Sequence, residues 1–308
     1  MENTRAKTTR NSLILLLTAT IWGMAFVSQS KGMDYMHPFT FNGVRSLIGA
    51  AGILIYILLS RKIAGDKAAK LDWKLNVRAG LLCGIFLTIA STLQQFGIKY
   101  TSVGKAGFIT TLYIIFVPMF GIFLKKKVAP VVWAAAGMAA VGMYLLCMTE
   151  SLRLGAGDIM VFLCAIAFAI QIMTVDHYAA RIDGAVVSCI QFTVCGVVCC
   201  IGALIWGQPT FGQIQEGLGA LLYAGVLSCG VGYTLQIVGQ KGLNPTVAAL
   251  IMSLESVIAT ISGWIAYKIG FLSTDQTLTP RQIAGCIIVF AAVILVQLPP
   301  EWFRFGKK

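Results

Sequence analysis

Charged residues are scarce in this sequence of 308 residues, making up 12% of it, against about 25% in ordinary soluble domains. Histidine is scarcer still, with two residues, and Asp and Glu together number 12. Hydrophobic residues make up 57%, and the mean hydropathy is +0.82. A soluble chain of this length would need far more polar side chains to cover its surface. The composition therefore excludes a soluble two-domain enzyme, a disordered chain and a disulfide scaffold, and it indicates a polytopic membrane protein.

Patterns typical of metal sites and of catalysis are also missing. The nine Cys residues lie within or at the ends of apolar runs, none forms a Cys-x-x-Cys pair, and the His residues are His37 and His177. We interpret these Cys residues as small packing residues and expect no metal and no cofactor. The sequence has no His-Glu-x-x-His, no paired Asp and no Gly-x-Ser-x-Gly, so we expect no enzyme.

Long apolar runs are what the chain has instead. A helix that spans a bilayer needs about 20 mostly apolar residues. Ten such runs lie at Ser12–Ser30, Pro38–Leu59, Val77–Ile98, Val103–Leu124, Val128–Met148, Gly157–Val175, Gly184–Trp206, Gly217–Val238, Asn244–Ile269 and Arg281–Leu298. The loops between them are too short for a soluble domain. We therefore expect an all-α polytopic membrane protein with ten transmembrane helices and tails at residues 1–11 and 299–308.

Lys and Arg are unevenly divided between the two sides of these expected helices. If the N-terminus is cytoplasmic, 17 of the 24 basic residues fall on the cytoplasmic side, and the other side holds Lys31, Lys99, Lys105, Arg153, Lys268 and Arg281. The positive-inside rule thus predicts cytoplasmic N- and C-termini in the cell membrane. The net charge of +12 is spread over short loops and tails, so we interpret it as a record of orientation and expect no nucleic-acid partner.

The two halves of the chain resemble each other at a shift of 142 residues. Thr92-Leu93-Gln94-x-x-Gly97-x-Lys99 then aligns without a gap on Thr234-Leu235-Gln236-x-x-Gly239-x-Lys241. The alignment places the third expected helix over the eighth and the fourth over the ninth, so the repeated unit has five helices. Because five is odd, the second unit enters the membrane from the opposite side, and we expect two inverted-topology repeats. The alternative is a duplication kept only for packing.

Several motifs follow the order of a known family. They are Trp22–Val27 in the first expected helix, Pro38-Phe39-Thr40-Phe41-Asn42-x-x-Arg45 in the second, Gly107–Thr110 and Val117-Pro118 in the fourth, Tyr233–Gln236 and Gln240 in the eighth, and Pro245–Ile251 with Leu254–Ala259 in the ninth. In these motifs the chain resembles the EamA-like branch of the drug/metabolite transporter superfamily. The resemblance implies one five-helix repeat at residues 12–148 and a second at 157–298. Ser256 is a departure, because the family usually has Pro after the Glu of the ninth helix.

The resemblance also implies a function. Members of this family are secondary transporters of small metabolites such as amino acids, amines or related compounds, and they often act as exporters. The expected partners are then a small-molecule metabolite, the lipid bilayer and protons as a candidate coupling ion, while the oligomeric state stays open. One alternative is a non-transporting membrane sensor or scaffold, but no loop or tail of the sequence is long enough for an effector domain. Another alternative is a flippase for lipid-like substrates on the same fold.

Two ionisable residues lie well inside the expected helices, where charge is costly and usually serves a function. Glu255 lies about 12 residues into the ninth helix, at a depth of roughly 18 Å and thus near the midplane. Arg45 lies about seven residues into the second, roughly 10 Å from the outer edge. For Glu255 we hypothesise a proton or cation site or an anchor for a substrate amine, and for Arg45 a clamp on a substrate carboxylate. The alternatives are a protonated Glu255 bonded within the bundle, a structural ion pair or a contact at the helix end for Arg45, and direct pairing of the two.

Five further residues form a weaker predicted shell around them: Trp22, Asn42, Gln94, Tyr113 and Gln236. Trp22 shares a helix face with Gln29, and Asn42 shares one with Arg45. Gln94 and Gln236 are equivalent in the repeat, as are Tyr113 and Glu255. The alternatives are hydrogen bonds between helices for the amides and packing for Trp22.

Overall fold

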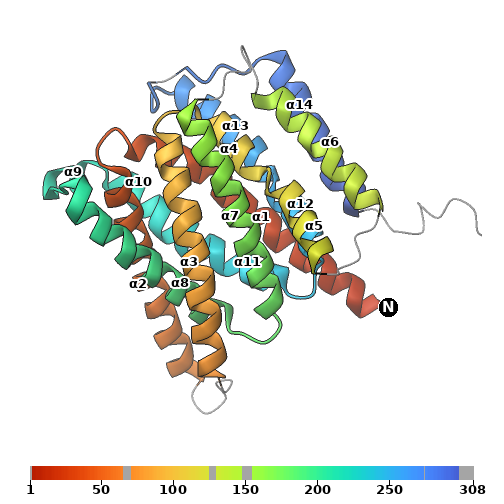
Figure 1. Cartoon of the computed structure of the whole chain (residues 1–308), viewed down its shortest axis with the longest axis horizontal. Helices are drawn as coiled ribbons and strands as arrows, with labels where there is room; N and C mark the ends of the chain where they lie inside the picture. The colour runs from red at the N-terminus through yellow and green to blue at the C-terminus, as the bar shows by residue number, and fades with distance from the viewer. Residues whose placement is uncertain (1, 65–70, 125–129, 148–154, 274, 298–308) are drawn as a thin grey trace, which may run out of the picture.

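The computed structural model describes residues 2–64, 71–124, 130–147, 155–273 and 275–297, and this part of the chain is helical without strands. The helices of the first half are α1 (Glu2–Gly32), α2 (Pro38–Ala64), α3 (Trp73–Ile98), α4 (Val103–Thr111), α5 (Tyr113–Phe123) and α6 (Pro130–Cys147). Those of the second half are α7 (Ala156–Tyr178), α8 (Gly184–Gly202), the π-helical η2 (Ala203–Gly207), α9 (Phe211–Glu216), α10 (Leu218–Leu222), the π-helical η3 (Tyr223–Gly232), α11 (Tyr233–Gln240), α12 (Pro245–Met252), α13 (Leu254–Lys268) and α14 (Pro280–Gln297). Figure 1 shows them as one bundle, with α6 and α14 paired at its edge.

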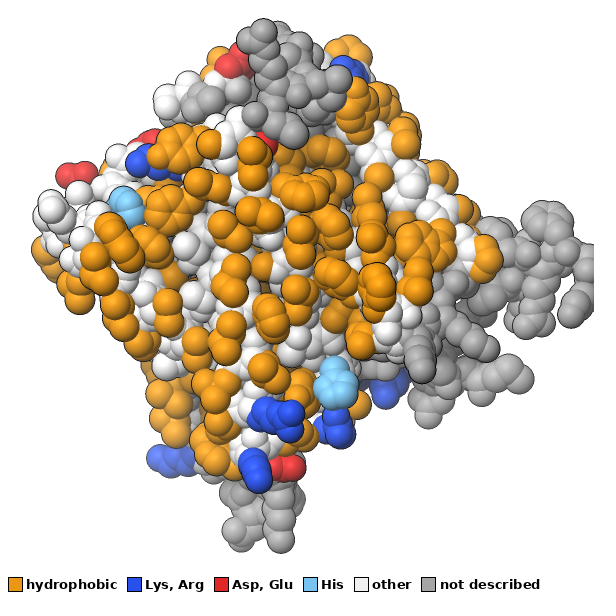
Figure 2. All heavy atoms as spheres, viewed as in Figure 1, with side chains coloured by type: hydrophobic (Ala, Val, Ile, Leu, Met, Phe, Trp, Pro, Cys, Tyr) orange, Lys and Arg blue, Asp and Glu red, His pale blue; other side chains and the backbone are white. Residues whose placement is uncertain are grey.

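Eight helical segments of the described chain are long and apolar enough to cross a membrane. Four of them join consecutive helices, namely α4 with α5, α8 with η2, α10 through α11, and α12 with α13. The apolar helices α6 and α14 are shorter, so ten spans and inverted topology stay predictions. Hydrophobic side chains cover most of the visible face in Figure 2, with Lys and Arg mainly toward its edges, as expected for a surface that faces lipid.

Local sequence signals set many of the helix starts. Side chains cap the first turns of α3, α4, α8 and α12 by accepting a backbone N–H, and these N-caps are Asp72, Ser102, Asp183 and Asn244. Proline occupies the first position of α2, α6, α12 and α14, where its missing N–H costs no helical hydrogen bond. Between these signals the bilayer favours helix, because every backbone group must be bonded internally there.

The main helix contacts keep the same pattern when the two halves are exchanged. α3 packs against α7 and α8, and the segment from α10 to α11 packs correspondingly against α1 and α2. α1 packs against α13, as α7 packs against α4 and α5. The pairs α2 with α8 and α6 with α14 join equivalent helices. Both halves therefore build the middle of the bundle together.

Two equivalent helices are interrupted near that middle, which hydropathy does not predict. α4 and α5 are separated at Leu112, and α12 and α13 are separated at Ser253. The 142-residue shift places these two breaks within one position of each other. Pro118 lies inside α5 and does not mark the first break. At the second, the hydroxyl groups of Ser253 and Ser256 donate to the carbonyls of Leu250 and Ser253 at 2.7 and 2.8 Å. The ninth expected helix is thus interrupted at Ser253, with serine hydroxyl groups and no proline at the break.

Candidate functional site

A small cavity at the middle of the bundle is lined by both halves of the chain. Its walls come from α1 to α5 and from α7, α8, η3, α11 and α13. Six of the seven predicted site residues line it: Trp22, Arg45, Gln94, Tyr113, Gln236 and Glu255. The cavity measures about 30 Å³, room for roughly two water molecules, since one needs about 10–15 Å³ by this measure.

The cavity lining repeats itself at the shift of 142 residues. Six pairs of lining residues are related by this shift: Phe26 and Phe168, Gln29 and Gln171, Leu87 and Cys229, Ser91 and Tyr233, Gln94 and Gln236, and Tyr113 and Glu255. Only the last two pairs were predicted from the sequence. Gln171 was not predicted from the sequence. The 142-residue shift relates Gln171 to Gln29, and this relation is the signal that would have identified it.

Glu255 and Tyr113 meet across this cavity. Each lies directly after a helix interruption, Glu255 in the first turn of α13 and Tyr113 at the start of α5. The Tyr113 hydroxyl donates a hydrogen bond to Oε1 of Glu255 at 3.0 Å, and both side chains are buried. In the described chain the second carboxylate oxygen, Oε2, has no hydrogen-bond partner. The site thus holds a carboxyl group with one oxygen anchored and one free.

Arg45 is buried beside the same cavity and is held from one side. Its Nε donates to Oδ1 of Asn42 at 2.8 Å, and its guanidinium carbon lies 5.5 Å from the centre of the Phe41 ring. Asn42 in turn donates to the Ser91 hydroxyl at 3.1 Å, so it positions Arg45 and does not itself line the cavity. Among the described residues, the two terminal nitrogens of Arg45 have no acceptor, and no ion pair joins Arg45 to Glu255. Direct pairing of these two residues is therefore not what the structure shows.

The amide side chains mostly tie helices together. Gln171 and Gln236 exchange two hydrogen bonds, at 3.4 and 3.2 Å, and so join α7 to α11. Gln94 donates to the Thr110 hydroxyl at 3.1 Å. These contacts match the structural alternative for Gln94 and Gln236, although both still face the cavity.

Trp22 combines packing with a polar contact. Its ring centroid lies 4.5 Å from that of Tyr233. Its Nε1 donates to the carbonyl oxygen of Ser228 at 3.4 Å. That carbonyl belongs to the π-helical η3, and π-helical turns often occur at functional sites. Trp22 therefore fixes the wall of the cavity that η3 forms.

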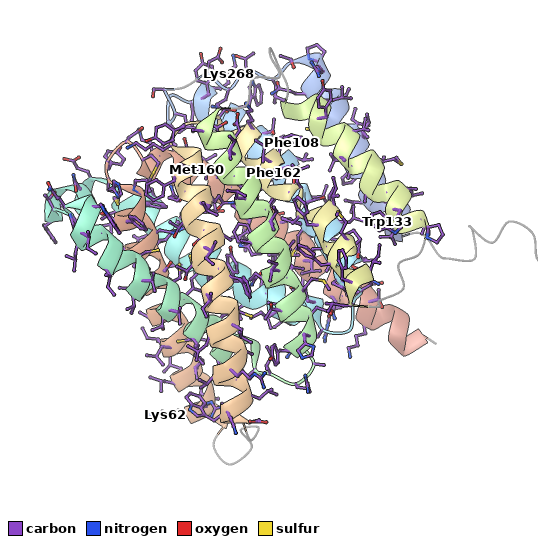
Figure 3. The ribbon with its side chains drawn as sticks, in the orientation of Figure 1. Lys62, Phe108, Trp133, Met160, Phe162 and Lys268 are labelled. Carbon is purple, nitrogen blue, oxygen red and sulfur yellow. The ribbon has the colours of Figure 1, made fainter. Side chains whose placement is uncertain are left out.

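Apolar layers lie on both sides of the cavity along α3. Ala79 and Cys83 belong to an apolar cluster with Val187 and Ile237, and Leu87, Ser91 and Gln94 follow in the cavity wall. Ile98 then joins a second apolar cluster that includes Phe26, Val103 and Ala259. In Figure 3, Lys62 and Lys268 mark the two opposite ends of the bundle. Along α3 the polar cavity therefore lies between two apolar clusters.

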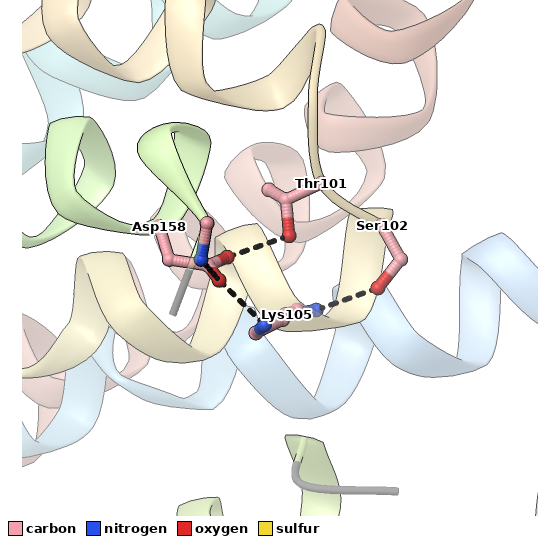
Figure 4. Close-up of polar contacts among 5 residues, drawn as sticks. Thr101, Ser102, Lys105 and Asp158 are labelled. Carbon is pink, nitrogen blue, oxygen red and sulfur yellow. Dashed lines mark hydrogen bonds and ion pairs between the residues drawn. The ribbon is translucent and has the colours of Figure 1, made fainter. Parts of the chain in front are cut away.

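An ion pair joins the halves beyond the second apolar layer. The Lys105 ammonium of α4 lies 2.6 Å from Oδ2 of Asp158 on α7. Thr101 donates to Oδ1 of Asp158 at 3.0 Å, and the Gly155 backbone N–H donates to Oδ2 at 2.9 Å (Figure 4). The other ion pair of the described residues, Lys31 with Asp34, links close neighbours at the end of α1. Lys105–Asp158 is thus the described ion pair that any separation of α4 from α7 must break.

Comparison with known proteins identifies the class to which this fold and site belong. The EamA-like transporter family matches residues 10–148 and again residues 155–298, and the chain belongs to this family of membrane transporters. It is therefore a multi-pass membrane transporter and not an enzyme.

Relatives match over nearly the whole chain. The chain is 27% identical to an uncharacterized transporter of Archaeoglobus fulgidus, over 92% of its own length and 84% of that protein. It is 24% identical to the uncharacterized transporter YwfM of Bacillus subtilis, over 94% of each chain. A crystal structure with 16% sequence identity superposes with a TM-score of 0.73, over 96% of this chain and 99% of the other, and so has the same fold.

Proposed function

We propose that this transporter moves a small polar or amphipathic metabolite, such as an amino acid or an amine, by alternating access of two inverted five-helix halves. One observation carries the proposal: a central cavity lined by six repeat-related pairs of residues, with Arg45 and Glu255 buried in its wall. Pairs related by an inverted repeat are what a site between two exchanging halves requires. Export is the expected direction, and cytoplasmic termini in the cell membrane are the expected orientation.

The chemistry of the cavity suits a substrate with a charged head and a small apolar part. The terminal nitrogens of Arg45 offer parallel donors, which match the two oxygens of a carboxylate. Oε2 of Glu255 offers an acceptor for an ammonium group or a place for a coupling proton. The rings of Trp22, Phe26 and Phe168 supply apolar surface in the same cavity.

Transport requires movement, because a cavity of about 30 Å³ holds water and no metabolite. The two apolar layers along α3 have to open in turn. Opening past the second layer also breaks the Lys105–Asp158 ion pair. The interruptions at Leu112 and Ser253 divide two helices beside the cavity, and such divided helices let one half-helix move while the other stays packed.

The test begins with a thermal-shift screen of the purified protein against amino acids, amines, nucleosides and organic acids, because a ligand that binds the native state raises its melting temperature. Compounds that bind are then followed in proteoliposomes under a proton gradient. We expect Glu255→Gln and Arg45→Gln to abolish uptake. The matched controls Glu216→Gln and Arg78→Gln remove equal charges at exposed positions outside the cavity and should transport normally. Transport by Glu255→Gln at the wild-type rate would rule out the proposed role of Glu255 in transport.

A flippase is not favoured over a metabolite transporter. The apolar groove between α2 and the α10–α11 segment shares no lining residue with the central cavity in the described chain. A lipid-like substrate would need a lateral route that connects the two.

A further inference from the structure

α2 and the segment from α10 to α11 touch at one level and then diverge. At Gly49 the backbones are close, since a Cβ there would lie 2.7 Å from Cβ of Cys229 and 2.8 Å from the Gly225 carbonyl. One turn later, at Gly52, a Cβ would meet nothing within 4 Å. The divergence leaves an apolar groove of about 440 Å³ whose walls include Ile53, Val231 and Leu235. Its lining contains no charged residue.

The groove continues into a polar cavity of about 630 Å³. Tyr56, Thr234 and Val238 line both spaces, so the two are contiguous. Three cationic side chains line the polar cavity, from the end of α2, the α7–α8 connection and the residue after α11: Arg61, Arg181 and Lys241.

The acidic residues of the polar cavity do not pair with these cations. Asp72 accepts the Leu75 backbone N–H at 3.0 Å, as the N-cap of α3. Asp183 accepts the backbone N–H groups at the start of α8, at 2.9 and 3.2 Å. Neither forms an ion pair among the described residues. Three cationic and two acidic side chains leave the polar cavity with an excess of one positive charge beside an uncharged groove, and its cations are not in ion pairs with its carboxylates among the described residues.

We propose that the two contiguous spaces form a binding site for one anionic phospholipid. The headgroup phosphate lies among Arg61, Arg181 and Lys241, and one acyl chain lies in the groove between α2 and the α10–α11 segment. The charge selects an anionic headgroup over a zwitterionic one, and the apolar groove selects a lipid over a soluble anion. Basic pockets between transmembrane helices are suited to anionic headgroups, which are abundant on the cytoplasmic face of membranes.

The site lies behind the wall of the proposed substrate cavity but is separate from it. Ser228 and Cys229 of η3 line the substrate cavity, whereas Val226 and Gly230 of the same helix line the groove. An acyl chain in the groove therefore contacts the outer face of the π-helical segment whose inner face forms the central site.

The headgroup part is tested with the purified full chain, incubated with equal amounts of phosphatidylglycerol and phosphatidylcholine that carry identical acyl chains. Bound lipid is counted by native mass spectrometry. We expect one phosphatidylglycerol to be retained in preference. Arg61→Ala should weaken its binding about fivefold, equivalent to about 1 kcal/mol per basic residue. Arg78→Ala removes the same charge from an exposed site on α3 outside both spaces and should change nothing.

The acyl-chain part is tested by Gly52→Leu, which fills the groove where no atom lies within 4 Å of the added Cβ. We expect it to lower phosphatidylglycerol retention at least fivefold. Gly137→Leu on α6, which also has open space around its Cβ, is the matched control and should bind normally. Equal retention of the two lipids, or unchanged retention in Arg61→Ala or Gly52→Leu, would overturn the proposal. So would displacement of the lipid by glycerol phosphate at equal concentration, because that result indicates a site for a soluble anion.

Discussion

The hydrogen bond between Tyr113 and Glu255 reports on the protonation of the buried carboxyl group. Both side chains are at most 4% exposed and their oxygens are 3.0 Å apart, so solvent screens the contact little. A hydrogen bond to a neutral partner contributes about 0.5–1.5 kcal/mol, and one to a charged partner about 1.5–3 kcal/mol. If Glu255 exchanges a proton, Tyr113→Phe should therefore destabilise the protein more at high pH than at low pH. The expected increase is about 1 kcal/mol.

A double-mutant cycle tests this expectation. The free energy of unfolding is measured by denaturant titration in detergent at pH 5.5 and at pH 8.5, for the wild type, Tyr113→Phe, Glu255→Gln and the double variant. Glu255→Gln keeps an oxygen that accepts the bond but cannot ionise, so the cost of Tyr113→Phe in this background should not change with pH. Tyr233→Phe is the control, because it removes a buried hydroxyl from the same cavity that has no hydrogen bond among the described residues.

Two results would refute the reasoning. A cost that is equal at both pH values and in both backgrounds means that Glu255 does not change protonation in this range, and the residue then cannot couple transport to protons. A cost near zero throughout means that the hydrogen bond itself contributes nothing to the folded protein.

Three other predictions concern packing, the ion pair and a helix cap. Gly142→Leu should separate α6 from α14 and lower the melting temperature, because a Cβ at Gly142 would lie 2.8 Å from the Gly285 carbonyl. Gly137→Leu on the same helix meets open space and is the control, and equal melting temperatures of the two variants would contradict the packing of α6 on α14. Asp158→Asn should lower the free energy of unfolding by about 1–3 kcal/mol, because it leaves Lys105 without its counter-ion. Asp34→Asn, which breaks the more exposed pair, should lower it by less than about 1 kcal/mol in the same denaturant titration. The reverse order would contradict this expectation. Burial and, to a smaller extent, the charge of Lys99 lower the pKa of His37 from its ordinary 6.5. Neutral His37 accepts the Phe39 N–H through Nδ1 at 3.3 Å, at the start of α2. The contribution of His37 to the free energy of unfolding is therefore full above pH 6.5 and is lost as the pH falls below that value. Unfolding measured between pH 5 and 8 should lose this dependence in His37→Gln, and an unchanged pH profile would rule out His37 as its source.

The membrane class and the outline of the repeat follow from the sequence alone. Runs of about 20 apolar residues are long enough to cross a bilayer, and each must be helical because lipid offers its backbone no hydrogen bonds. Within so few charges, Arg45 and Glu255 were identifiable as buried ionisable groups, because an unpaired charge in lipid has to face the interior. The shift of 142 residues by itself makes Tyr113 the counterpart of Glu255, and the two side chains are hydrogen bonded.

The tertiary structure decided which side chains meet and where the helices break. Hydropathy measures the transfer of a segment into lipid and does not distinguish a continuous helix from two that are separated at Leu112 or Ser253. It also contains no distance between helices far apart in sequence. Only packing could show that Asn42 holds Arg45, that Arg45 does not pair with Glu255, and that Gln171 faces Gln236. The groove beside α2 forms because α2 and its neighbour diverge past Gly49. This divergence depends on how the two helices pack against each other, so the sequence of either helix alone does not predict it.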